Sequence, residues 1–203
     1  MPTTEQILAG LRTISNAWRV LAIFWHVYFA ALSIGLVAGV RPSKRYFGVL
    51  LCLPLLSVSL VAWLSGNPFN GLVFALLGFA LIYVTFRFRE EKIQTAGLWP
   101  VITGIAMIIF GWIYPHFLDT PSPVSYLYAA PTGIIPCATL SIVVGFALVL
   151  GNFRTRAFAT ILGITGLFYS LTGIFQLGVK IDWFLLVGTI LLLSFAFFDR
   201  RRT

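Results

Sequence analysis

Six polar or ionisable residues attract attention because they lie in or beside long apolar stretches, where such side chains are rare. They are Arg19, His26, His116, Asp119, Cys137 and Thr139. Polar groups are costly in hydrocarbon, and those that occur there commonly mark a solute or ion path. We expect the six to line one polar cleft that opens to the outer side of a membrane. His26 would be its binding or gating residue, and Arg19 would attract anions.

Each of these residues also has a structural interpretation. A histidine such as His26 can be satisfied by hydrogen bonds inside a helix bundle, and Arg19 can extend to the headgroups as an anchor. His116 suits the membrane interface, and Cys137 suits close packing among small neighbours. The sequence alone leaves both interpretations open.

The residue types argue against other kinds of chemistry. The apolar stretches contain no Asp or Glu, the usual carriers in proton-driven transport, and no lysine late in the chain for a retinal Schiff base. The two cysteines and two methionines are too few for a copper carrier. His26 and His116 are expected at different depths, which disfavours a haem. We therefore expect no cofactor, no metal and no catalytic residue.

The elements that must position these residues follow from the composition. The chain has 203 residues, of which 59% are hydrophobic and 10% charged, and its mean hydropathy is +0.96. Soluble domains carry about 25% charged residues. Because so little charge cannot cover a surface that faces water, we predict an all-α, polytopic bundle embedded in a membrane.

Apolar runs long enough to cross about 30 Å of hydrocarbon recur along the chain. We expect seven transmembrane helices, at 17–40, 46–64, 71–86, 98–117, 133–150, 157–175 and 183–198. In the preceding segment 1–16, apolar residues recur at helical spacing, which predicts an amphipathic helix on the membrane surface. Residues 17–198 then form the membrane domain, and 199–203 form a basic cytoplasmic tail.

The fifth run is expected to be the centre of the bundle. Gly133, Cys137, Ser141 and Gly145 recur every four residues, so a helix would place their small side chains on one face. Such a face lets a second backbone approach closely. Pro136 is expected to bend this helix near its start.

The basic residues predict the orientation. If the C-terminus is cytoplasmic, eleven of the 14 Lys and Arg residues face the cytoplasm: Arg41, Lys44, Arg45, Arg87, Arg89, Lys92, Arg154, Arg156, Arg200, Arg201 and Arg202. This asymmetry follows the positive-inside rule and places the N-terminus outside. The net charge of +8 then lies at the inner leaflet, where we expect anionic lipid headgroups, and not nucleic acid, as partners. The small-residue faces also allow a homo- or hetero-oligomer.

One short segment resembles a known family. The segment Pro131-Thr-Gly-Ile-Ile-Pro136-Cys137-Ala-Thr139 resembles a bacterial family of small multi-pass integral membrane proteins of unassigned function. In that family a second proline follows the cysteine, where this chain has Ala138. The resemblance implies a location in the inner (plasma) membrane and brings no activity with it.

The leading functional expectation is a transporter-like or small-solute-binding membrane protein. The alternative is a non-catalytic assembly or partner-binding subunit, and an intramembrane enzyme ranks third. The packing of the helices distinguishes the first two. A common water-accessible void at the polar residues would favour the transporter, whereas a dry contact that satisfies the nitrogens of His26 would favour the subunit.

Overall fold

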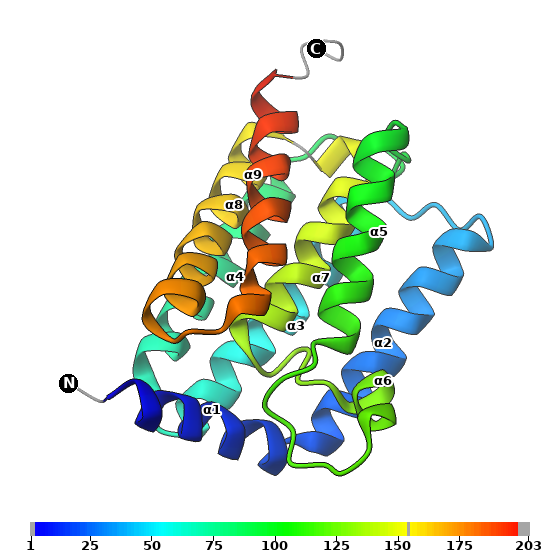
Figure 1. Cartoon of the computed structure of the whole chain (residues 1–203). Coiled ribbons are helices and arrows are strands. Elements are labelled where there is room, and N and C mark those ends of the chain that lie inside the picture. The colour runs from blue at the N-terminus through cyan, green and yellow to red at the C-terminus, as the bar shows by residue number, and fades with distance from the viewer. Residues whose placement is uncertain (1–2, 154, 199–203) are drawn as a thin grey trace.

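The structure, a computed structural model, describes residues 3–153 and 155–198 (Figure 1). The predicted basic tail 199–203 and Arg154 lie outside the described residues. Within the described ranges the fold is all-α, as predicted. Its nine α-helices are α1 (Thr4–Ala17), α2 (Arg19–Val37), α3 (Lys44–Leu64), α4 (Pro68–Phe86), α5 (Leu98–Ile113), α6 (Tyr126–Ala129), α7 (Pro136–Val149), α8 (Arg156–Leu171) and α9 (Trp183–Phe198).

Five segments are long and apolar enough to cross a membrane, which supports the prediction of a membrane protein. They are Arg19–Val37, Lys44–Leu64, Pro68–Phe86, Arg156–Gln176 and Lys180–Phe198. The helices α5 and α7 are apolar but shorter, with 16 and 14 residues. At 1.5 Å per residue they span only about 24 and 21 Å.

Helix α7 lies at the centre of the bundle and packs against α3, α5, α8 and α9 (Figure 1). All of its residues except Cys137 and Val149 are buried. A helix that is apolar on every side needs such an enclosed position. The fifth apolar run is therefore the element around which the other helices pack.

The closest approach between helices joins α7 to α5. A Cβ atom added to Gly145 would lie 2.7 Å from the carbonyl oxygen of Gly104, and one added to Gly104 would lie 2.6 Å from that of Gly145. A Cβ at Gly111 would lie equally close to the carbonyl oxygen of Ala138, at 2.6 Å. Small residues thus bring these two backbones together, as in other helix pairs in lipid.

The predicted bend at Pro136 is wrong, because α7 begins at this residue. Proline lacks an N–H and is well tolerated in the first helical position, where that donor would have no partner within the helix. Gly133 precedes the helix and has a φ of +75°, so it belongs to a turn and not to the predicted helical stripe. The buried turn 130–135 therefore fills the space that a longer helix was expected to occupy.

Helix α1 ends and α2 begins at Trp18, close to the predicted boundary between residues 16 and 17. Figure 1 shows α1 lying across one end of the bundle. The apolar side chains of α1 are Ile7, Leu8, Leu11 and Ile14, and they pack into one cluster with Tyr114 and Val179. The apolar face of α1 therefore rests on the bundle end, whereas a membrane-surface location remains a prediction.

Candidate functional site

His26 lies in a dry contact between α2 and α5. Only 4% of its surface is exposed. Its Nδ1 lies 2.8 Å from the carbonyl oxygen of Ala22, and its Nε2 lies 3.0 Å from that of Trp112. Both ring nitrogens thus face protein partners, which matches the structural interpretation of this histidine.

Arg19 joins the start of α2 to the segment that contains α6. One of its Nη atoms donates to the Ser125 hydroxyl at 3.2 Å and to the Tyr128 hydroxyl at 3.3 Å. Hydrogen bonding to Ser125 and the Arg19 cation lower the pKa of Tyr128. Arg19 therefore links α2 to the α6 segment through hydrogen bonds at the protein surface.

His116 and Asp119 lie in the loop after α5 and face α1. Asp119 forms an ion pair with Arg12 at 3.0 Å, and its N–H donates to Asn16 Oδ1 at 3.0 Å. His116 is half-buried, and burial together with the Arg12 cation lowers its pKa. Asp119 thus helps to hold α1 over the bundle end, whereas the ring of His116 packs against that of Phe117, with centroids 4.2 Å apart.

Thr139 stabilises the buried turn before α7. Its hydroxyl accepts from the Gly133 N–H at 2.8 Å and donates to the Ile135 carbonyl at 2.8 Å. Thr132 donates to the carbonyl of Gly111, also at 2.8 Å. Non-helical backbone at membrane depth needs such internal partners. Thr139 therefore supports the turn, and the predicted site residues described so far have separate partners.

The remaining predicted residue, Cys137, has a neighbour that the sequence analysis missed. Asp182 is 1% exposed and lies in the short 3₁₀ turn η4 (Lys180–Asp182), directly before α9. The Tyr114 hydroxyl donates to Asp182 Oδ1 at 2.8 Å. The Cys137 thiol lies close enough to interact with both groups. Three chemically active side chains from distant parts of the chain therefore meet in one cluster.

Asp182 is buried in the protein, although no buried acid was expected from the sequence. The continuous apolar segment Lys180–Phe198 includes it near the start. The seventh predicted helix, 183–198, begins one residue after Asp182, which left this acid in the preceding loop. Its position directly before an apolar run could have indicated burial, because a helical turn at that point can direct the side chain into the bundle.

The backbone around Asp182 is irregular. Helix α8 continues into a π-helix, η3 (Thr172–Gln176), and the Val179 N–H donates to the carbonyl of Gly173 at 2.8 Å. A Cβ atom at Gly173 would collide with Oδ2 of Asp182, so only glycine leaves space for the carboxyl group. Gly178, in the same loop, has a φ of +70°. Short π-helical segments frequently occur at functional sites.

The electrostatic setting of Asp182 is unusual because no described Lys, Arg or His forms an ion pair with it. Its neighbours are a hydroxyl and a thiol, and Lys180 on the same turn is exposed. Tyr114, which holds the carboxyl group, belongs to the apolar cluster that α1 covers. Asp182 is thus a carboxyl group inside the protein without a neutralising cation in the described ranges.

The site offers little to a metal ion. Within the described part of the chain, no three His, Cys, Asp or Glu side chains gather closely enough to hold one. Asp182 and Cys137 alone supply two ligands of different preference, oxygen and sulfur. The cluster is better suited to exchange of a proton.

Comparison of the chain with family models, with curated proteins and with solved structures found no match in any of the three. Functional inference therefore depends on the geometry of the buried cluster.

Proposed function

We propose that this protein is a transporter-like membrane protein in which Asp182, Tyr114 and Cys137 form a proton-binding site coupled to movement of a small solute. The observation that carries this proposal is the burial of Asp182 without a cation beside it. Intramembrane carboxyl groups of this kind are typical proton carriers in pumps and transporters.

Opposing effects act on the carboxyl group. Burial favours its neutral form, because an isolated charge in a medium of low polarity is costly. The hydrogen bond donated by the Tyr114 hydroxyl favours its charged form. Because the hydrogen bond offsets part of the cost of burying the charge, we expect Asp182 to exchange a proton within the folded protein.

The irregular segments around the site supply a means of movement. The π-helix η3 and the turn at Gly178 give the chain after α8 a choice of hydrogen-bonding registers. Asp182 is in contact with Gly173 of η3, so a change in its charge acts directly on this segment. Protonation would thus be linked to the packing of α8 against α9.

The topology proposed here has seven crossings, made by α2, α3, α4, α5, α7, α8 and α9. The shortness of α7 is compensated by the buried turn 130–135, as in broken helices that build sites within membrane proteins. The distribution of basic residues supports an outer N-terminus. The cluster then lies near the outer side, beneath α1.

Infrared titration tests proton binding directly, because a protonated carboxyl group has its own C=O band. We expect the purified protein to show a buried carboxyl band that disappears in Asp182→Asn. The matched control is Asp119→Asn, which removes an exposed acid in an ion pair with Arg12. The control should retain the band. Equal spectra for both variants would contradict the proton-binding site.

A second measurement tests the coupling to a solute. Proteoliposomes that contain a pH-sensitive dye are exposed to panels of small ions, sugars and amines. We expect at least one solute to drive proton movement in the native protein and in Asp119→Asn but not in Asp182→Asn. A proton site without solute-driven movement would refute transport.

The alternative function is a non-catalytic, partner-binding membrane subunit. The burial of His26 between two backbone carbonyls favours it, because a side chain held in this way is not free to gate a cleft. Under this alternative, Asp182→Asn would change stability but neither proton binding nor solute movement. Co-purification of a second membrane protein in constant ratio would then identify the partner.

A further inference from the structure

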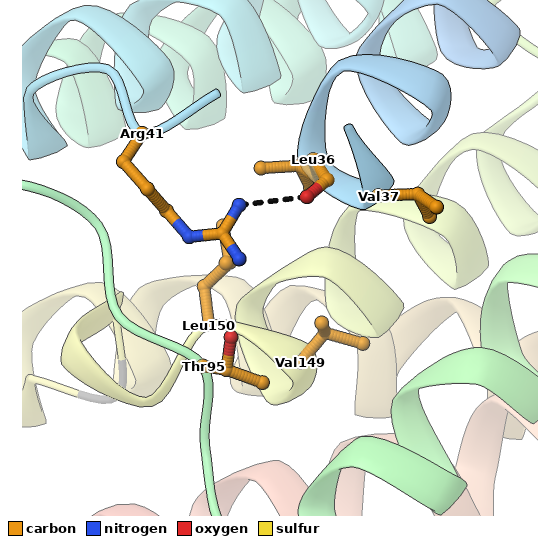
Figure 2. A pocket seen from close by; sticks show the side chains of 6 residues that line it. All are labelled: Leu36, Val37, Arg41, Thr95, Val149 and Leu150. Atoms are coloured by element: carbon orange, nitrogen blue, oxygen red, sulfur yellow. Dashed lines mark hydrogen bonds between the residues drawn. The ribbon is translucent and has the colours of Figure 1, made fainter. Parts of the chain in front are cut away.

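A separate hollow lies at the opposite end of the bundle from α1. Its volume is about 150 Å³, and Figure 2 shows its lining residues: Leu36, Val37, Arg41, Thr95, Val149 and Leu150. It lies where the end of α2, the segment before α5 and the end of α7 meet. None of these residues belongs to the Asp182 cluster, so this hollow is independent of the proposed function.

Backbone pairing forms a fixed wall for the hollow. The N–H of Ala96 donates to the carbonyl of Val149 at 2.8 Å, and the N–H of Gly151 donates to that of Gln94 at 3.0 Å. These bonds pair the segment before α5 with the end of α7, with Thr95 opposite Leu150. The wall therefore does not depend on flexible side chains.

Arg41 is held over this hollow with one edge of its guanidinium available. Its Nη1 donates to the carbonyl of Leu36, in the last turn of α2, at 2.7 Å (Figure 2). The same atom donates to the carbonyl of Val40, just beyond α2, at 3.1 Å. The described residues provide no partner for Nε or Nη2. This remaining pair of donors is the edge that binds a phosphate group through two parallel hydrogen bonds.

Neighbouring cations at this end are already engaged with the protein. Arg45 pairs with Glu90 at 2.9 Å. The amino group of Lys44 lies 4.2 Å from the centre of the Phe88 ring. Within the described ranges, Arg41 differs from Arg45 because it has no carboxylate partner, and from Lys44 because no aromatic ring covers its charge.

The rest of the lining suits a hydrocarbon chain. Leu36, Val37, Val149 and Leu150 are aliphatic, and Val37 is 90% exposed in a helix that is apolar enough to span a membrane. Trp99, close to Thr95 in the sequence, is 72% exposed, as is common for tryptophan at a membrane interface. A lipid has a charged headgroup next to acyl chains. Arg41 next to exposed aliphatic side chains can therefore contact both parts of one lipid.

We propose that this hollow binds an anionic phospholipid. The Nε and Nη2 donors of Arg41 hold the phosphate, the Thr95 hydroxyl supplies a further donor, and one acyl chain lies along Leu36 and Val37 at the end of α2. A free phosphate ion could form the same hydrogen bonds, but it would make no favourable contact with the aliphatic lining.

The test uses the full chain in nanodiscs and native mass spectrometry to count bound lipid. Phosphatidylglycerol is titrated against a background of phosphatidylcholine. Arg41→Gln should weaken phosphatidylglycerol binding by about tenfold or more, since it removes two hydrogen bonds to a charged phosphate and one such bond contributes about 1.5–3 kcal/mol. The matched control is Arg87→Gln, which removes an exposed cation hydrogen-bonded to Tyr83 at 2.7 Å. This control should bind nearly as well as the native protein.

Two further arms keep the proposal falsifiable. Thr95→Val changes an exposed side chain of similar size, so it should fold normally and weaken binding by a smaller factor than Arg41→Gln. Equal losses in Arg41→Gln and Arg87→Gln would show attraction by overall charge and overturn the site. Competition by inorganic phosphate, with the same loss in Arg41→Gln, would show that the ligand is a soluble anion and overturn the lipid assignment.

Discussion

Replacement of Tyr114 by phenylalanine tests the charge on Asp182. The change removes one hydroxyl group and leaves the ring in its buried position, where Tyr114 has no exposed surface. The lost hydrogen bond is 2.8 Å long and ends on a carboxyl oxygen. A hydrogen bond to a charged group contributes about 1.5–3 kcal/mol to stability, compared with about 0.5–1.5 kcal/mol for a neutral pair.

Tyr169 provides a matched control for this variant. Its hydroxyl donates to Asn70 Oδ1, also at 2.8 Å, and the residue is 7% exposed. Tyr169→Phe therefore removes a bond of the same length from a neutral acceptor. We expect Tyr114→Phe to lower the free energy of unfolding by about 1–1.5 kcal/mol more than Tyr169→Phe where Asp182 is charged.

The assay is equilibrium unfolding in mixed micelles, repeated across a range of pH. As the medium is acidified and Asp182 takes up a proton, its bond with Tyr114 becomes a neutral one. The excess loss in Tyr114→Phe should then disappear, while the loss in Tyr169→Phe stays constant. An excess that is independent of pH, or absent throughout, would refute proton exchange at Asp182.

Further variants test other parts of the structure. Gly145→Ala should cost about 1–3 kcal/mol in the same unfolding assay because its Cβ would meet the α5 backbone, whereas Gly10→Ala, with no atom within 4 Å, should be neutral or stabilising. Thr139→Val should cost about 1–3 kcal/mol, since the N–H at the start of the buried turn loses its acceptor; an unchanged midpoint would contradict this role. The lowered pKa of His116 means that its protonation opposes folding, so stability should fall as the pH drops below about 6.5, and His116→Gln should reduce that fall in unfolding curves.

The sequence predicted those parts of the fold that follow from composition and hydropathy over long segments. Low charge and long apolar runs indicated a helical membrane protein, and the uncharged run that contains Gly145 indicated the central helix. The sequence also predicted that another helix would approach this central helix closely, because small residues at regular spacing permit it. The partner helix was not foreseeable, since small residues recur in other runs as well.

The features that were missed depend on single residues. Pro136 is compatible with a bend inside a helix or with a helix start, and tertiary packing of the turn before it selected the start. Asp182 stands next to an apolar run, and only the packing of Tyr114 and Gly173 around it reveals that it is buried. Apart from Cys137, the predicted polar residues have separate partners in the protein and do not line one cleft, as His26 shows with its two backbone carbonyls.

The resting place of α1 has a consequence for how the membrane acts on this protein. Its apolar face, with Leu11 at the centre, packs on the bundle end, yet a face of this kind also inserts well between loosely packed lipids. If α1 lies at the membrane surface as predicted, protein and leaflet compete for this apolar face, and strong curvature shifts the balance toward the leaflet. Amide hydrogen exchange at residues beneath α1, around Val179, should accordingly be faster in small, highly curved vesicles than in flat nanodiscs.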